Sequence, residues 1–134
     1  MVSVELLGRG ALTRRDAELA ILRTAWLCQA PYEWGEHVVQ GKTAGLSAKE
    51  IERIIAGPSA RAWNAKDRAI LRAVEELHDD AMVSEKTWAA LAKHLNDAQL
   101  FELLVLVGQF TMVGYFQNTL RLRLEPGNLG LKAR

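Results

Sequence analysis

Two residues in the first third of the chain, Glu33 and His37, have the types and spacing needed for acid–base chemistry. They are four residues apart, so on a helix both side chains project from one face about one turn apart. A carboxylate beside an imidazole can fix its tautomer, raise its basicity and share a proton with it. An ion pair on the protein surface gives the same spacing, so the pattern alone leaves both interpretations open.

Glu18 is the third candidate for chemistry. On a helix it shares a face with Ile21, Leu22 and Ala25, and a carboxylate on an apolar face is costly to bury unless it is paired. The alternative is a solvated carboxylate paired with Arg14, four residues earlier. Glu18 could also join the pair above as a third metal ligand, as in catalytic zinc sites, but we expect no metal.

Aromatic residues and the single cysteine are the remaining features near these candidates. Tyr32 and Trp34 flank Glu33, where they could line a substrate pocket or anchor the start of a helix. Cys28 is the only cysteine, which excludes an intrachain disulfide, a CxxC pair and a ribbon-type zinc site. Its apolar neighbours favour a core thiol over a nucleophile.

Length and charge indicate one domain without a nucleic-acid surface. The chain has 134 residues, and its 17 basic and 16 acidic residues leave a net charge of +1. We expect a single domain over residues 1–134, with no strong charge field for binding a phosphate backbone. The first ten residues contain no apolar segment typical of a secretory signal, so we expect a cytoplasmic protein.

The elements that must position these residues are helices. Prolines, glycines and capping residues divide the chain into helical segments, and no segment shows convincing strand alternation. The sequence predicts an all-α subunit with six helices, covering residues 13–28, 32–44, 47–57, 64–77, 84–95 and 96–121. The first ten residues and the tail after Glu125 are expected to be loose.

The sixth predicted helix is the most apolar part of the chain. Leu103–Gly108 is uninterrupted, but Glu102, Gln109 and Gln117 break the longer run, so we expect a buried helix and no membrane span. A helix that is apolar on nearly all sides needs cover on all sides, and five short neighbours do not readily supply it. This pattern favours a subunit interface.

Several stretches together resemble the carboxymuconolactone decarboxylase family, which shares the alkylhydroperoxidase-D-like fold. The likeness covers the core, residues 12–123, and is carried by Arg15–Arg23, Tyr32–Trp34 with His37, Ala44–Ser47, Ala69–Leu77 and Val107–Phe110. The resemblance implies a six-helix alkylhydroperoxidase-D-like subunit in a trimer or hexamer, with pockets at or near subunit contacts.

The peroxidase branch of this family carries a CxxC pair before a histidine and a glutamate nineteen residues before that histidine. In this sequence the glutamate corresponds to Glu18 and the histidine to His37, while Ala30 and Glu33 stand at the two cysteine positions. A disulfide-cycling peroxidase needs an attacking and a resolving thiol. The sequence therefore resembles the lactone-decarboxylase branch, which works without a cofactor.

The resemblance suggests a lyase or isomerase for a small organic acid or lactone. We expect His37 to act as the acid–base group, Glu33 to orient it and Glu18 to donate or relay a proton. Tyr32 and Trp34 would shape the substrate pocket, and Arg15 and Arg23 would offset the charge of the two glutamates if they face the site.

Two other functions stay open at this stage. One is a hydroperoxidase activity inherited with the fold, which the missing cysteine pair disfavours. The other is a non-catalytic oligomeric helical protein that binds a small molecule. A helix-turn-helix reading of residues 47–57 is disfavoured by the neutral charge of the chain.

Overall fold

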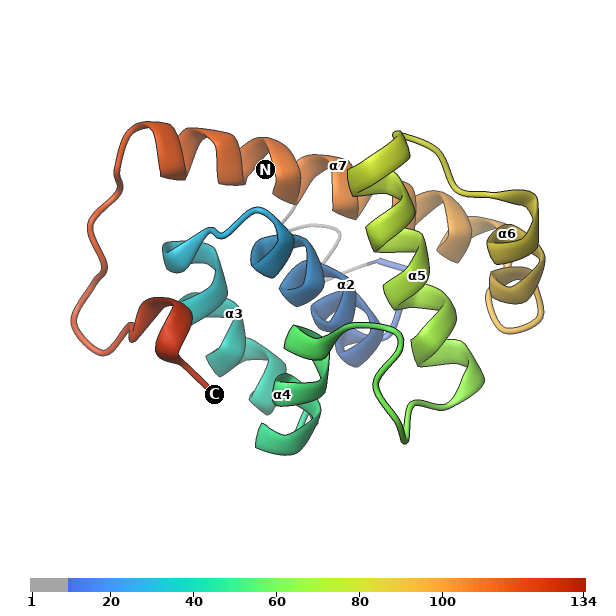
Figure 1. Cartoon of the computed structure of the whole chain (residues 1–134), viewed down its shortest axis with the longest axis horizontal. Helices are drawn as coiled ribbons and strands as arrows, with labels where there is room; N and C mark the ends of the chain where they lie inside the picture. Colours follow the sequence, from blue (N-terminus) through green and yellow to red (C-terminus); the bar gives the residue numbers. More distant parts are fainter. Residues whose placement is uncertain (1–9) are drawn as a thin grey trace.

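A computed structural model describes residues 10–134, so the expectation for residues 1–9 lies outside it. Within this part the chain forms six α-helices and one short 3-10 helix, with no strand (Figure 1). The predicted all-α, six-helix architecture is confirmed there. The helices are α2 (Arg14–Leu27), α3 (Pro31–Thr43), α4 (Ala48–Ala56), α5 (Ala65–Asp80), α6 (Glu85–Ala92) and α7 (Asp97–Thr119), followed by η1 (Gly130–Lys132).

The helix starts lie where the capping residues predict them, whereas α5 continues past the predicted end at Leu77 to Asp80 and α6 ends at Ala92, before the predicted Leu95. Ser47 and Glu50 form a reciprocal capping box at the start of α4, and side chains at the other predicted caps accept backbone N–H bonds, namely those of Thr13, Asn64, Ser84 and Asn96. Gly45, with φ 108°, ends α3 in the left-handed conformation that favours glycine. Local signals therefore determine where the helices begin.

Helix α2 occupies the centre of the molecule. It packs against α3, α4, α5 and α7, which surround it (Figure 1). All ten residues from Asp16 to Ala25 are buried, so this helix has no solvent-facing side over that stretch. Because four of these ten are polar or charged, each needs a partner. Thr24 donates to the carbonyl of Ala20 in the same helix, whereas the three charged residues find partners on α3, α4 and α5.

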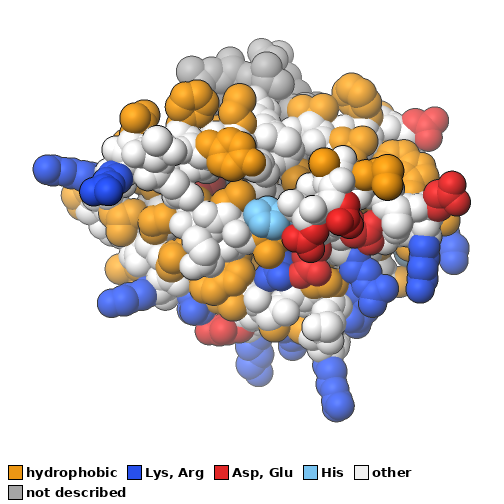
Figure 2. Space-filling view, turned by 45° about the horizontal axis from the view of Figure 1, so that its top comes forward, with side chains coloured by type: hydrophobic (Ala, Val, Ile, Leu, Met, Phe, Trp, Pro, Cys, Tyr) orange, Lys and Arg blue, Asp and Glu red, His pale blue; other side chains and the backbone are white. Residues whose placement is uncertain are grey.

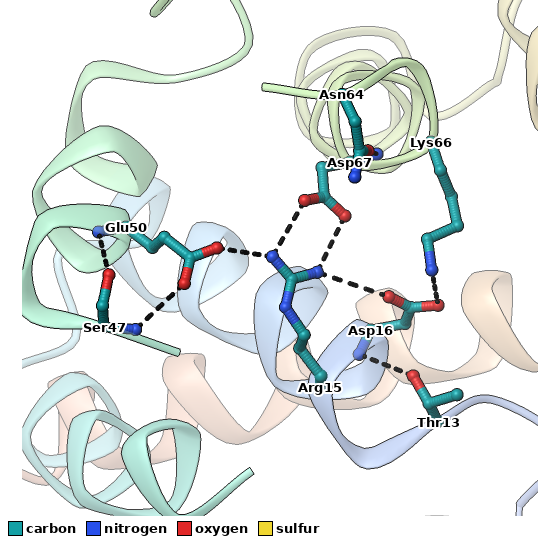
Figure 3. Close-up of polar contacts among 8 residues, drawn as sticks. All are labelled: Thr13, Arg15, Asp16, Ser47, Glu50, Asn64, Lys66 and Asp67. Atoms are coloured by element: carbon teal, nitrogen blue, oxygen red, sulfur yellow. Dashed lines mark hydrogen bonds and ion pairs between the residues drawn. The ribbon is translucent and has the colours of Figure 1, made fainter. Parts of the chain in front are cut away.

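One charge cluster ties the start of α2 to α4 and α5 (Figure 3). The Arg15 guanidinium donates to both carboxylate oxygens of Asp67 at 2.9 Å and to Glu50 at 2.5 Å. Lys66 lies 3.0 Å from Asp16 on the other side of the cluster. Two-point pairing of an arginine with a carboxylate fixes direction as well as distance, so this cluster sets how α5 sits on α2.

Helix α7 lies across one side of the molecule and is covered on one face only. Leu103, Leu106 and Phe110 are buried in the core, whereas a second set of large apolar side chains is exposed, including those of Phe101, Met112, Tyr115 and Phe116. Hydrophobic side chains are spread over this side of the surface (Figure 2). The expected shortage of cover for this helix is therefore confirmed within the single chain.

Among the described residues, α7 is the one helix long and apolar enough to cross a membrane by length and composition. The core helix of a soluble protein can pass the same test. Only 39% of its most apolar stretch is buried, so more than half of that stretch is partly or fully exposed in this chain.

The tail after Glu125 was expected to be loose, and this expectation is wrong. Trp34 Nε1 donates to the carbonyl of Ala133 at 3.0 Å, and Asn128 Nδ2 donates to the carbonyl of Tyr32 at 3.1 Å. Ala133 is buried in the core and η1 packs on α3. Sequence patterns missed this docking because it depends on single hydrogen bonds between residues about a hundred positions apart, and not on a periodic pattern.

The contact between Gly35 and Asn128 provides a test of the docked tail. A Cβ at position 35 would lie 1.6 Å from Asn128 Oδ1, so Gly35→Ala should displace the tail and lower the free energy of unfolding by about 1–2 kcal/mol. In an Asn128→Ala background the clash is absent, and the same substitution should be neutral or stabilising by up to about 1 kcal/mol because alanine favours helix. Urea unfolding of the four proteins measures both effects. Equal effects in the two backgrounds would contradict the docked tail.

Candidate active site

The three candidate residues of α2 and α3 meet in one hydrogen-bonded unit. His37 Nδ1 lies 2.7 Å from Glu18 Oε2, and His37 Nε2 lies 2.9 Å from Glu33 Oε1. The imidazole therefore bridges two carboxylates that come from different helices. The structure brings these three side chains together, and their catalytic roles stay a prediction.

This unit is buried. Glu18 is 0% exposed, and Glu33 and His37 are each 5% exposed, so the surface ion pair that the spacing allowed is not what forms. The ring of Phe110 from α7 stands edge-on to the imidazole, with 5.2 Å between ring centroids. Arg14 Nη2 lies 4.0 Å from Glu18 Oε1, and its side chain is half exposed. The carboxylates are thus held in a largely apolar setting with one cation at its edge.

The imidazole is held in its protonated form. Burial lowers the pKa of His37, but the hydrogen bonds and negative charges of Glu18 and Glu33 outweigh it and raise the pKa to about 9. Near neutral pH both ring nitrogens then carry protons, and each donates one to a carboxylate. His37 is therefore an imidazolium with no free lone pair.

Each carboxylate keeps one oxygen without a hydrogen-bond partner. Glu18 Oε1 and Glu33 Oε2 are buried and accept no hydrogen bond from the described residues, although Arg14 Nη2 lies 4.0 Å from Glu18 Oε1. An unmet buried acceptor costs free energy, and Asp16 Oδ1 and Glu102 Oε1 are two others among the described residues. A bound molecule that donates hydrogen bonds would satisfy the two oxygens of the site.

The two arginines expected to offset the glutamate charge have other partners. Arg15 is held by Asp67 and Glu50, as described above. Arg23 donates to the carbonyls of Ile54 and Ile55, at 2.9 Å each, and pairs with Glu75. It thereby caps the end of α4. Neither guanidinium contacts the glutamates of the site, because its partners on α4 and α5 fix it elsewhere.

The two aromatic residues expected to shape a pocket also have structural contacts. Trp34 is 0% exposed and stacks edge-on with Trp26 in addition to holding the tail. The Tyr32 hydroxyl donates to Glu125 at 2.7 Å, and this bond raises the pKa of the phenol to about 12. Both residues hold the tail on α3, and neither is shown to face Glu33 and His37.

Cys28 follows α2 and is half-buried. Cys28 lies close to Gly114 of α7. A Cβ at position 114 would be 3.5 Å from the Cys28 Cβ and 3.8 Å from its Sγ. Burial raises the pKa of the Cys28 thiol, and a hydrogen bond with Thr111 partly opposes this. A thiol held in its neutral form is a poor nucleophile, as the sequence predicts.

Phe110 is a neighbour of the site that the sequence did not predict. The only signal for Phe110 in the sequence was its place in the apolar segment that resembles the family.

Among residues 10–134, the structure groups no three His, Cys, Asp or Glu side chains in a way suited to a metal ion. At the candidate site, both nitrogens of His37 are bonded to carboxylates, so neither is available as a metal ligand.

The first part of the chain matches a known protein family. Residues 3–76 match the model of the carboxymuconolactone decarboxylase family, which is more than half of the chain. This range includes Glu18, Glu33 and His37. No curated protein matches the chain.

Solved structures from three bacteria share the fold. A protein of unknown function from Agrobacterium tumefaciens, a putative antioxidant defence protein AhpD, superposes with a TM-score of 0.84 at 17% identity, and the match covers 92% of this chain and 86% of that one. An uncharacterized peroxidase-related protein from Silicibacter sp. TM1040 superposes with a TM-score of 0.83 at 14% identity, and the match covers 95% of this chain and 69% of that one. An alkylhydroperoxidase AhpD core protein, an uncharacterized peroxidase-related protein from Ralstonia eutropha JMP134, superposes with a TM-score of 0.81 at 17% identity, and the match covers 96% of this chain and 72% of that one. At these identities the likeness shows the fold alone.

The protonated state of His37 predicts how stability depends on pH. A group whose pKa is raised by folding stabilises the protein below its unfolded pKa, and this contribution is lost as pH rises through the folded pKa. Between about pH 6.5 and 9 the free energy of unfolding should fall by on the order of 3 kcal/mol, and His37→Gln should abolish most of that fall. Urea unfolding across this range measures it, with His78→Gln at an exposed position as the control. An unchanged slope in His37→Gln would show that His37 is not protonated in the folded state.

Proposed function

Because the chain belongs to the carboxymuconolactone decarboxylase family, we propose that it is a cofactor-free acid–base enzyme, a lyase or isomerase that acts on a small organic acid or lactone. The observation that supports this is the buried imidazolium between two carboxylates, each with one free oxygen. Such a unit can take up and release a proton without any other group, which both reactions require.

The contacts favour a division of roles that differs from the one expected from the sequence. Both nitrogens of His37 donate to carboxylates, so the imidazole cannot act directly on a substrate while these bonds last. The free oxygen of Glu33 is the better candidate for direct contact, because Glu18 is the more deeply buried of the two. We assign Glu33 as the group that exchanges a proton with the substrate and His37 as its positioning residue and proton store.

Either reaction can proceed through this unit. In a decarboxylation, the carbon–carbon bond electrons pass to the substrate as carbon dioxide leaves, and the new carbanion takes a proton. His37 supplies that proton through Glu33, and solvent then reprotonates the imidazole. In an isomerisation, Glu33 removes a proton from one carbon and returns it to another.

Access to the site requires its cover to move. Glu33 and His37 are almost fully enclosed, and Phe110 stands against the imidazole. Exclusion of water strengthens the hydrogen bonds and charges inside such a site. A substrate therefore enters by displacing side chains that are packed in the ligand-free chain.

Substitutions at Glu33 and His37 test the proposed function. In a screen of small lactones and oxo-acids, Glu33→Gln and His37→Gln should each lower kcat by about 10²- to 10⁴-fold, because proton exchange is lost. Glu36→Gln is the matched control, since it removes a carboxylate from α3 that pairs with the tail and not with His37. Circular dichroism and urea unfolding check that each variant folds.

Cys28→Ala separates this function from a thiol peroxidase. The acid–base mechanism does not use the thiol, so the variant should retain full turnover. Peroxide reduction that needs Cys28, with lactone turnover absent, would overturn the proposal. Unchanged lactone turnover in Glu33→Gln would remove Glu33 from the mechanism.

We also propose that the chain acts as a homo-oligomer, a trimer or hexamer, joined through the open face of α7. The exposed side chains of Phe101, Tyr115 and Phe116 form an apolar surface on this face, and such surfaces are typical of subunit contacts. A shallow apolar groove lined by Tyr115, Phe116, Thr119 and Leu120 continues it.

Light scattering coupled to size-exclusion chromatography tests this assembly. The protein should elute with three or six times the mass of the chain, and the double variant Tyr115→Lys, Phe116→Lys should shift it to the monomer, since charges there would be buried unpaired. Lys86→Glu on exposed α6 is a control for charge change alone. A wild-type monomer at micromolar concentration would contradict the proposal.

A further inference from the structure

A hollow on the surface of the molecule lies between the end of α5 and the exposed side of α7. It has a volume of about 340 Å³, and its lining includes Leu77 of α5 and, from α7, Leu104, Val107, Met112 and Tyr115. None of the residues that line it is charged. Because an apolar cavity of about 150 Å³ can hold a benzene molecule, this hollow has room for a leucine side chain.

The rim of this hollow carries negative charge. Asp79 and Asp80 end α5 shortly after Leu77, and Asp80 lies about one turn beyond Leu77 on the same face of the helix. Both aspartates are exposed, and neither forms an ion pair with a cation among residues 10–134. Acidic side chains lie beside hydrophobic ones on this side of the surface (Figure 2). The hollow is therefore suited to a partner that is apolar and positively charged.

The segment that follows α7 has this character. Residues 120–124, which we call the arm, have the sequence Leu-Arg-Leu-Arg-Leu, and the three leucines are 73%, 48% and 43% exposed. Arg121 and Arg123 are exposed as well, and within the described part of the chain neither pairs with a carboxylate. The backbone N–H groups of residues 123–125 donate to no described group. Exposed apolar side chains gathered in this way are typical of a surface that a partner covers.

The arm cannot reach the hollow of its own chain. From Gly108, which also lines the hollow, to Leu120 the helix rises by about 18 Å. The other end of the arm leads into the tail, which Asn128 and Ala133 hold on α3. The arm leaves α7 at the end far from α5 and turns toward η1 (Figure 1). A second copy of the chain can supply an arm to this hollow.

Resting on the homo-oligomer proposed above, we infer that the arm of one copy binds in the hollow of the next copy. Leu122 enters the hollow, where it is covered by the apolar side chains of α5 and α7. The two arginines of the arm pair with the two aspartates of the partner's rim. This contact matches apolar surface with apolar surface and two positive charges with two negative ones, which fixes the register of the two copies.

The arm and the hollow are different surfaces, so the contact is head-to-tail. Each copy gives its arm to one neighbour and receives the arm of another. Contacts of this kind close into rings when the rotation between copies allows it, whereas a two-fold contact stops at two copies. A ring of three copies built in this way accounts for the proposed trimer, and two such rings account for the hexamer.

Disulfide cross-linking in Cys28→Ala protein tests the contact and its direction. Leu122→Cys places a thiol on the arm, and Met112→Cys places one in the hollow. On oxidation, a chain with both substitutions should form linked products of more than two chains, whereas Leu122→Cys alone should stay unlinked. Ala92→Cys, at an exposed position of α6, is the control and should not link to Leu122→Cys. No product from the Leu122–Met112 pair, or equal linking to position 92, would overturn the inference.

Charge reversal provides an independent test by light scattering. The arm variant Arg121→Glu, Arg123→Glu and the rim variant Asp79→Arg, Asp80→Arg should each fall from the mass of the oligomer to that of one chain, because like charges then meet. A chain with all four substitutions should regain the mass of the wild type, which a variant that fails to fold would not do.

The outcomes separate this contact from the assembly itself. An oligomer that keeps its mass in both charge-reversed variants and gives no cross-link would overturn the inference and leave the proposed homo-oligomer standing. A wild-type protein that is monomeric at micromolar concentration would overturn both. Turnover that depends on Glu33 and His37 is measured separately and tests the proposed reaction alone.

Discussion

A central helix that is buried on every side and still carries ionisable residues is the constraint on which this structure depends. A charge can be buried at low cost only when a partner meets it, so three charged residues of α2 each fix the position of a neighbouring helix. Arg15 binds α4 and α5, Glu18 binds α3 through His37, and Arg23 binds the end of α4 together with Glu75 on α5. The hydrophobic contacts provide most of the stability, whereas these polar contacts determine which arrangement of helices is formed.

The candidate site is one of these polar contacts and differs from the others in its composition, since an imidazole bridges two buried carboxylates from different helices. Unmet buried acceptors are not particular to it, because Asp16 Oδ1 and Glu102 Oε1 also lack a hydrogen-bond partner. Titratable groups that interact strongly in a buried setting are typical of functional sites. The two carboxylates would repel each other on their own, and the protonated imidazole between them offsets this repulsion and holds them close together.

Local signals in the sequence predict the fold well, because the position of a helix end depends on neighbouring residues such as Ser47, Gly45 and Gly57. The spacing of Glu33 and His37 allows their pairing, and the apolar helix face around Glu18, together with the resemblance to the family, singles out Glu18. The sequence does not predict where Arg15 and Arg23 point, since their partners lie on α4 and α5, more than thirty positions away in the chain. It also gives no sign that the tail docks through Trp34 and Asn128, because single hydrogen bonds between distant residues leave no periodic pattern.

The central claim is that a buried imidazolium bridges two carboxylates, and side-chain ¹⁵N NMR of His37 tests it most directly. At about pH 7.5 both ring nitrogens should show the chemical shifts of protonated N–H groups, each with a slowly exchanging proton, and this state should persist until the pH approaches the pKa of about 9. A spectrum with one protonated and one unprotonated nitrogen at that pH would contradict the claim, because a neutral imidazole can donate to only one of the two carboxylates.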